Sequence, residues 1–176
     1  MIAHKLTIDH PFELEAGGVL PRLELVYHTS EGRAEGRRVV WICHALTANS
    51  DVEQWWPQMA GPGKFIDTLK DFVVCVNILG SPYGSSSPAS TNPATGKPFL
   101  LDFPKVTIRD IVRSFNFVRN HLGINSIDLL VGSSIGGFQA LEWAVAEPQL
   151  FKSAVFMATA PRVSPWLSAS AEAQRM

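Results

Sequence analysis

Residues 127–144 constrain the fold of this chain more than any other segment. Their sequence, IDLLVGSSIGGFQALEWA, is an apolar run of β type that breaks at small residues and restarts with helical spacing. The break contains the pattern G-x-S-x-G, in which Gly132 and Gly136 flank Ser134. A strand that turns directly into a helix strains the backbone at its apex, so the flanking residues need very small side chains. The pattern predicts a strand, a sharp turn with Ser134 at its apex, and a helix.

Ser134 is the candidate nucleophile of this turn. Its side chain is expected to project from the fold, beside backbone N–H groups and the positive end of the helix dipole. A turn without catalytic function would also need glycines, and an isolated G-x-S-x-G match occurs by chance. Here an apolar strand precedes the turn and an apolar helix face follows it, which favours the nucleophile. Ser133 lies one position before the apex and is expected to point elsewhere.

The composition is that of an ordinary globular protein. The 176 residues are 46% hydrophobic and 18% charged, with a formal net charge of −1 and no cluster of basic residues. These values argue against a nucleic-acid or anionic-membrane partner. No segment has the composition of a secretory signal or the ~18 apolar residues of a membrane span, so we expect a cytoplasmic protein. Cys43 and Cys75 lie in separate apolar runs and are expected to be buried thiols, with no metal site.

Alternating β and helical segments predict an α/β fold. The N-terminal segments 12–15 and 23–27 alternate apolar with polar residues across a glycine turn, which predicts an antiparallel hairpin. The alternation of strands and helices later in the chain indicates parallel crossovers with helices on both faces of the sheet. The expected parallel strands are residues 38–44, 72–79, 127–133 and 151–158, and the expected helices are 65–69, 107–122, the segment after Ser134, and 165–176.

Two connections leave the carboxyl ends of the expected strands, where ligands bind in open α/β sheets. The first is residues 45–50, and the second is residues 80–104, rich in Gly, Ser, Pro and Asn. A connection as long as the second is usually functional or disordered. After it, Thr107 is expected to begin a helix with Asp110 as its capping partner, and Gly123 to end it. Arg109 opposes the dipole of that helix, so either an acidic partner or simple solvation is expected for it.

The order of elements is that of the first part of an α/β-hydrolase sheet, and it suggests acyl chemistry at Ser134. Two backbone donors are needed for the oxyanion of the tetrahedral intermediate. One is the N–H of Ile135, directly after the candidate nucleophile, and the other is expected from the 45–50 connection, with Leu46 as the best candidate.

A general base cannot be assigned. In this fold the acidic residue and the histidine follow the serine, but no histidine follows His121 in the sequence. His44 precedes the oxyanion connection and is a weak substitute. We therefore expect residues 1–176 to be the N-terminal part of a single longer domain, with the triad Asp and His outside this chain and a lid beginning near residues 165–176.

Four segments resemble the homoserine O-acetyltransferase family of the α/β-hydrolase superfamily. The family usually has glycine where this chain has Ser133, and often S-T-G-P near residues 85–88, where this chain has S-S-S-P. The resemblance is carried by HALT at 44–47, NILGS with YGS at 77–85, FPKVTIRD at 103–110, and GSSIGG with QALEWA at 132–144.

The resemblance implies an acetyl group transferred from acetyl-CoA to Ser134 and then to the hydroxyl group of L-homoserine, for methionine biosynthesis. It also implies no permanently bound cofactor, a helical lid and a homodimer. Related enzymes transfer succinyl groups or act on serine, and a serine esterase or thioesterase could use the same turn. A binding module of this fold without catalysis is a further alternative, because it would tolerate loss of Ser134.

Overall fold

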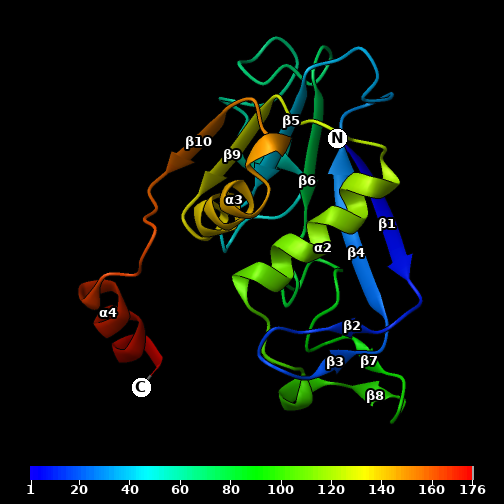
Figure 1. The fold of residues 1–176 in the computed structure, drawn as a ribbon, viewed down its shortest axis with the longest axis vertical. Helices are drawn as coiled ribbons and strands as arrows, with labels where there is room; N and C mark the ends of the chain where they lie inside the picture. Colours follow the sequence, from blue (N-terminus) through cyan, green and yellow to red (C-terminus); the bar gives the residue numbers. More distant parts are fainter. Residues whose placement is uncertain (176) are drawn as a thin grey trace.

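The structure is a computed structural model that describes residues 1–175. Its main element is a six-stranded sheet in the order β1-β4-β6-β5-β9-β10 (Figure 1). The strands of this sheet are β1 (Ile2–Ile8), β4 (Leu23–Thr29), β5 (Val39–Cys43), β6 (Phe72–Val76), β9 (Leu129–Ser133) and β10 (Ala154–Met157). Strands β5, β6, β9 and β10 are parallel, as the sequence predicts.

The centre of the sheet is apolar on both faces. All five residues of β5 and all five of β6 are buried, as expected for strands covered on both sides. Register places Cys43 opposite Gly132, so the end of β5 lies directly beside the turn that contains Ser134. The two connections considered above therefore leave the same edge of the sheet as this turn.

The N-terminal pairing differs from the expected hairpin. Strand β4 pairs with β1, a strand that the sequence reading missed, in the register Ile2 to Thr29 and Ile8 to Leu23. The segment after β1 forms a separate two-stranded ribbon of β2 (Phe12–Glu13) and β3 (Val19–Leu20). Residues Leu23, Leu25 and Tyr27 of β4 point into the core, which fixes its register against β1 and β6.

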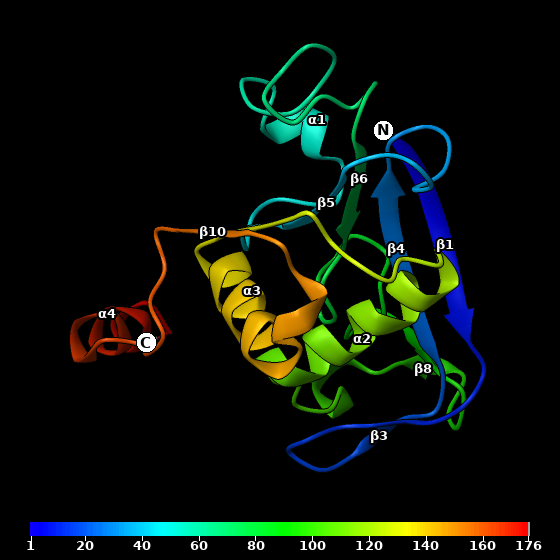
Figure 2. The ribbon, with the colours of Figure 1, turned by 45° about the horizontal axis from the view of Figure 1, so that its top comes forward.

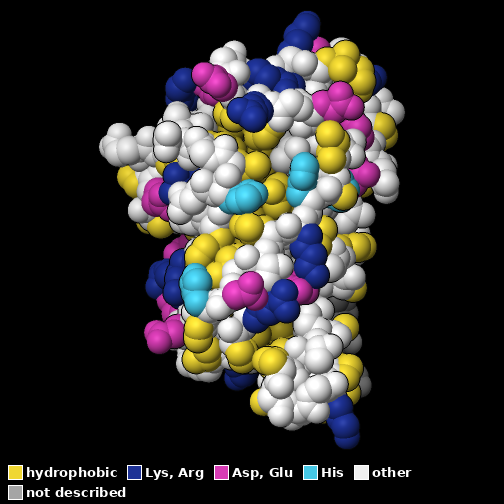
Figure 3. Space-filling model, turned by 90° about the vertical axis from the view of Figure 1, so that its right-hand side faces the viewer, with side chains coloured by type: hydrophobic (Ala, Val, Ile, Leu, Met, Phe, Trp, Pro, Cys, Tyr) yellow, Lys and Arg dark blue, Asp and Glu magenta, His cyan; other side chains and the backbone are white. Residues whose placement is uncertain are grey.

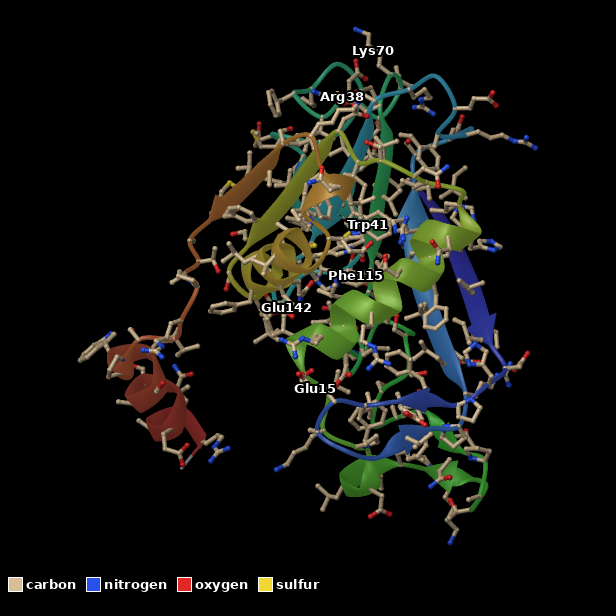
Figure 4. All side chains as sticks on the ribbon, viewed as in Figure 1. Glu15, Arg38, Trp41, Lys70, Phe115 and Glu142 are labelled. Carbon is tan, nitrogen blue, oxygen red and sulfur yellow. The ribbon has the colours of Figure 1, made fainter. Side chains whose placement is uncertain are left out.

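Two helices cover one face of the sheet. They are α2 (Ile108–His121) and α3 (Ile135–Ala146), and both lie in front of the strands in Figure 1. Between them and the sheet, Trp41 packs against Phe115, with ring centroids 6.0 Å apart (Figure 4). Trp41 also packs edge-on against Trp143, with centroids 4.9 Å apart. The predicted capping box of Thr107 and Asp110 is present at the start of α2.

The opposite face is covered by α1 (Val52–Trp55) and the segment that follows it (Figure 2). The short helix expected at 65–69 is wrong, because those residues form turns and one β-bridge between Ile66 and Ala60. Cys43 and Cys75 are buried thiols, as expected. Burial raises the pKa of both thiols, so they are uncharged.

The long connection 80–104 is ordered. It contains the ribbon β7 (Thr91–Asn92) and β8 (Lys97–Pro98), followed by the 3-10 helix η1 (Leu100–Asp102). Buried Ser85 and Ser86 attach it to β4, since their hydroxyls accept hydrogen bonds from the N–H groups of Val26 and Glu24 at 3.1 and 2.9 Å.

The C-terminal region begins with the 3-10 helix η2 (Pro148–Leu150), continues through β10 and ends in α4 (Pro165–Arg175). Helix α4 projects away from the sheet (Figure 1) and buries none of its residues. Over the β1 edge, basic and acidic side chains are interspersed (Figure 3). Among the described helices, none is both long enough and apolar enough to cross a membrane.

Candidate active site

Ser134 occupies the apex between β9 and α3. Its backbone has φ 54° and ψ −122°, a conformation that side-chain-bearing residues rarely adopt, and it is exposed at the N-terminus of α3. Its side chain makes no capping hydrogen bond. The strained apex expected from the sequence is thus present, and the hydroxyl is accessible to a reagent.

Close packing around the turn leaves no space for side chains at the flanking glycines. A Cβ atom on Gly136 would lie 2.1 Å from the carbonyl oxygen of Cys43, and one on Gly132 would lie 2.3 Å from the carbonyl oxygen of Gly136. Gly137 is equally restricted, because a Cβ there would lie 2.5 Å from Thr159. The helix therefore lies very close to the end of β5 and to the residues after β10, and this contact holds Ser134 in place.

A cleft of about 850 Å³ opens at Ser134. A second hollow of about 400 Å³ adjoins it and shares Leu46, Ile108 and Ile135 with it. The volume of the larger cleft is in the range of small-molecule sites. Its lining is mostly apolar and comes from the 44–50 loop, from α2, α3 and α4, and from residues 160–163.

The backbone donors proposed from the sequence border this cleft. Leu46 and Ile135 both line it together with Ser134, and Leu46 is 65% exposed. Within residues 1–175, neither the N–H of Leu46 nor that of Ile135 has a hydrogen-bond acceptor. Two unpaired N–H groups beside an exposed hydroxyl are what an oxyanion site requires.

His44 does not serve as a base in this structure. It is fully buried, its Nδ1 lies 2.8 Å from the carbonyl oxygen of Ala45, and its Nε2 lies 3.4 Å from the backbone nitrogen of Ile78. Both ring nitrogens are therefore engaged by the backbone. Burial lowers the pKa of His44, which keeps the ring neutral. No histidine lines the cleft in the described part of the chain.

Glu142 is the one charged residue among those described that line the cleft. Its Oε1 accepts a hydrogen bond from Nε of Arg109 at 2.7 Å, and Arg109 also pairs with Glu15. Figure 4 shows Glu15 and Glu142 near the same end of α2. The hydrogen bond to Glu142 raises the pKa of Arg109. Of the two expectations for Arg109, the acidic partner is confirmed: Glu15 follows strand β2 of the N-terminal ribbon, and Glu142 lies on α3.

The sequence reading missed most of the cleft lining. The lining includes Ile108 of α2 and Phe138 and Leu141 of α3, which belong to apolar helix faces of the kind that a sequence pattern predicts to be core. The sequence reading also missed the side chains that hold the 44–50 loop, because their partners are distant in sequence.

Known proteins share both the sequence and the fold of this chain. A family model described as alpha/beta hydrolase fold matches residues 38–176. Curated homoserine O-acetyltransferases from Chlorobaculum parvum and Trichormus variabilis are 44% and 45% identical over 94% of this chain, which covers 47% and 46% of their lengths. The chain thus spans about half the length of the curated relatives it matches.

Solved structures show the same architecture. The homoserine O-acetyltransferase from Bacillus anthracis matches 96% of this chain and 49% of its own, with 28% identity and a TM-score of 0.84. Esterase E22 matches 98% of this chain and 52% of its own, with 28% identity and a TM-score of 0.81.

Proposed function

Because the chain belongs to the α/β-hydrolase family, we propose that the protein containing it transfers an acetyl group from acetyl-CoA to the hydroxyl group of L-homoserine. One observation carries the acyl chemistry: Ser134 is an exposed serine in a strained conformation, beside two unpaired N–H groups at the edge of an apolar cleft. The choice of substrates is supported by the relatives named homoserine O-acetyltransferase, at 44–45% identity over 94% of the chain.

The reaction proceeds in two steps. Oγ of Ser134 attacks the thioester carbonyl carbon, the C–S bond breaks, and coenzyme A leaves as its thiol with the proton that Oγ gives up. The hydroxyl of homoserine then attacks the acetyl-serine carbonyl, the ester bond to Ser134 breaks, and the proton returns to Oγ. In each step the carbonyl oxygen carries negative charge, which the N–H groups of Leu46 and Ile135 stabilise.

Proton transfer in both steps requires a base that the described residues do not supply at the cleft. We assign the base and its acidic partner to the half of the relatives' length that this chain does not span. The proposal includes a lid beginning near residues 165–176, a cytoplasmic homodimer, and no permanently bound cofactor. A lid would exclude water, and transfer then prevails over hydrolysis.

Hydrolysis of an ester or thioester is the second candidate function. Esterase E22 supports it, because the two chains share the fold at a TM-score of 0.81 and the cleft is apolar enough for simple esters. The two candidates differ in the second nucleophile, which is homoserine in one and water in the other. Donors with a succinyl group and serine as acceptor remain alternatives within the transferase reading.

The proposed function is tested in the complete protein that contains residues 1–176. Incubation with acetyl-CoA alone, followed by peptide mapping, should find acetyl on Ser134, and Ser134→Ala should abolish it while Ser133→Ala should not. Addition of homoserine should release the acetyl group as O-acetylhomoserine. Release at the same rate in buffer alone would establish the hydrolase, and acetyl on Ser133 would refute the assignment of the nucleophile.

A further inference from the structure

The 44–50 loop carries Leu46, yet it has little regular structure of its own. Its single internal backbone hydrogen bond runs from the N–H of Ala48 to the carbonyl oxygen of Ala45, at 3.0 Å. Leu46 is 65% exposed, so its side chain does little to fix the loop. The direction of the Leu46 N–H is therefore set by contacts between the loop and the rest of the chain.

Two side chains contact the middle of the loop. Nε1 of Trp55 donates to the carbonyl oxygen of Asn49 at 2.8 Å. The hydroxyl of Tyr83 lies 3.4 Å from the carbonyl oxygen of Thr47, and further contacts hold the two ends.

His44 anchors the first end. Because a carbonyl oxygen can only accept, the 2.8 Å contact with Ala45 requires a proton on Nδ1. A neutral ring then has an acceptor at Nε2, which faces the N–H of Ile78 at 3.4 Å. The backbone thus fixes both the tautomer and the orientation of this buried ring.

Asn77 anchors the second end. Its Oδ1 accepts a hydrogen bond from the N–H of buried Ser50 at 2.7 Å, and its Nδ2 donates to the carbonyl oxygen of Tyr83 at 2.8 Å. Its own backbone is held at both polar atoms, by Val26 and by the hydroxyl of Ser85. The residue is buried, and its amide group cannot rotate without losing one of these bonds.

Both ends of the loop are therefore held by two consecutive residues that follow β6, Ile78 through its N–H to His44 and Asn77 through its side chain to Ser50. The hydroxyl of Ser50 also lies 2.7 Å from Nδ1 of His28 on β4, which ties the same end of the loop to a second strand. We propose that His44 and Asn77 are positioning residues that aim the N–H of Leu46 at the oxyanion of the acyl-transfer reaction. This inference rests on the proposed function of Ser134, although neither residue touches the substrate.

A positioning role predicts an effect on kcat more than on KM. The developing negative charge exists in the transition state, so a misdirected donor weakens transition-state binding and leaves binding of acetyl-CoA nearly unchanged. Complete loss of such a donor typically costs ~10²–10³ in rate, so misdirection should cost about 10- to 100-fold. A merely structural role would lower the melting temperature and the yield, with kcat per folded molecule unchanged.

The test uses the complete protein and a pair of variants at each anchor. Asn77→Ala removes the acceptor for Ser50, whereas Asn77→Asp keeps an oxygen for Ser50 and replaces the donor to Tyr83 with a carboxyl oxygen. His44→Ala removes the acceptor for Ile78, whereas His44→Gln can place an amide oxygen near the position of Nε2. We expect both alanine variants to lose kcat about 10- to 100-fold, and the conservative variant of each pair to recover much of it.

Asn116→Ala is the matched control for lost stability. Asn116 lies on α2, donates to Glu147 at 2.6 Å and accepts from Arg119 at 2.8 Å, so none of its partners belongs to the 44–50 loop. Its loss should lower the melting temperature and leave kcat per folded molecule unchanged. If Asn77→Ala and His44→Ala behave like Asn116→Ala, the positioning proposal is wrong.

Two substrates distinguish a failure of the positioning proposal from a failure of the proposed function. Kinetics are measured with acetyl-CoA and homoserine and with p-nitrophenyl acetate, because any acyl transfer at Ser134 forms an oxyanion. If wild type cleaves the ester but transfers nothing to homoserine, the proposed function fails and the variant pairs still decide the positioning role. If wild type acts on neither, both proposals fail.

Discussion

The β9–α3 and β10–α4 segments have the same order of elements, but the surrounding structure holds them very differently. In each, a parallel strand is followed by a residue other than glycine in the left-handed region, Ser134 with φ 54° and Ala158 with φ 47°. After Ser134 the helix begins at once and packs on the sheet. After Ala158 the chain continues without regular structure to Pro165, and α4 buries none of its residues.

The comparison of Ser134 with Ala158 shows which contacts hold a residue in a strained backbone conformation. Beside Ser134, Gly132 and Gly136 have no Cβ atom, so α3 lies close against the end of β5 and backbone contacts confine the apex. Ala158 instead follows the edge strand β10, where Val155 and Phe156 are 42% and 40% exposed. An apolar strand sequence predicts a strand, but burial depends on a second neighbouring strand and a covering helix.

The largest difference in the free energy of unfolding is expected between substitutions of two tryptophans. Trp143 of α3 is fully buried against Trp41, whereas Trp166 of α4 is 81% exposed. Trp143→Ala should lower the free energy of unfolding of the 176-residue chain by about 3–5 kcal/mol through the cavity it leaves. Trp166→Ala should change it by less than about 0.5 kcal/mol. Urea denaturation measures both, and equal losses would show that α4 is packed in solution.

The next largest loss of stability is expected from substitution of a glycine in the turn. Gly136→Ala should destabilise the chain by about 1–3 kcal/mol, because the added Cβ would press on the backbone of β5. The comparison in α4 is Ser168→Ala, which removes a hydroxyl group at an exposed helix position and is expected to be neutral within about 0.5 kcal/mol. A wild-type urea midpoint for Gly136→Ala would contradict the close packing of α3 on the sheet.

Backbone strain is tested by substituting glycine for Ser134 and for Ala158, the two residues with positive φ compared above. Ser134→Gly should raise the free energy of unfolding by about 1 kcal/mol, because it relieves a rare backbone conformation that the packing enforces. Ala158→Gly should gain less, since a loosely held residue can relax without substitution and glycine also adds freedom to the unfolded chain. Urea midpoints of the two variants measure the gains in stability. A larger gain for Ala158→Gly would show that Ala158, and not Ser134, is the more strained residue.

The last comparison concerns the dependence of stability on pH. Burial lowers the pKa of His44, which belongs to the 44–50 loop, and of His28, which contacts Ser50 of that loop, whereas residues 154–175 contain no histidine. Below the unfolded pKa of about 6.5 the unfolded state binds more protons, so stability is full above that pH and falls as the pH drops toward the folded pKa values. Each histidine contributes at most about 1.4 kcal/mol per pH unit.

Urea midpoints at about pH 7.5 and 5.5, on either side of the unfolded histidine pKa, measure this loss. His44→Gln, which does not titrate, should show a smaller fall than wild type, and His121→Gln on the exposed end of α2 serves as the control. An equal fall in wild type and His44→Gln would show that other groups govern acid sensitivity.

Local sequence signals predicted the central strands, the turn at Ser134 and the capped helix α2. Each depends on residues that are neighbours along the chain, such as the glycines at 132 and 136 or the pair Thr107 and Asp110. The predicted pairing of 12–15 with 23–27 was wrong and β1 was missed, because the partner of an alternating segment is selected by tertiary packing and not by its own sequence.

The contacts that organise the candidate site are distant in sequence and were therefore missed. Arg109 meets Glu15 and Glu142 across separations of 94 and 33 residues, and Ser50 meets Asn77 across 27. Their side chains carry no local pattern that identifies the partner. The chemistry suggested by Ser134 could be read from the sequence, but the contacts that orient Leu46 could not.

The strand order β6-β5-β9 has a consequence for the speed and order of folding. Strand β5 pairs with β9, and the contact at the start of that pairing, from Val39 to Asp128, closes a loop of 89 residues. Closing a loop of that length is entropically costly and slow, so β1, β4, β5 and β6 can associate before β9 joins them. During synthesis the loop with Leu46 emerges long before Ser134. The two halves of the candidate site therefore meet late, and a nascent chain exposes the apolar edge of β5 until β9 arrives.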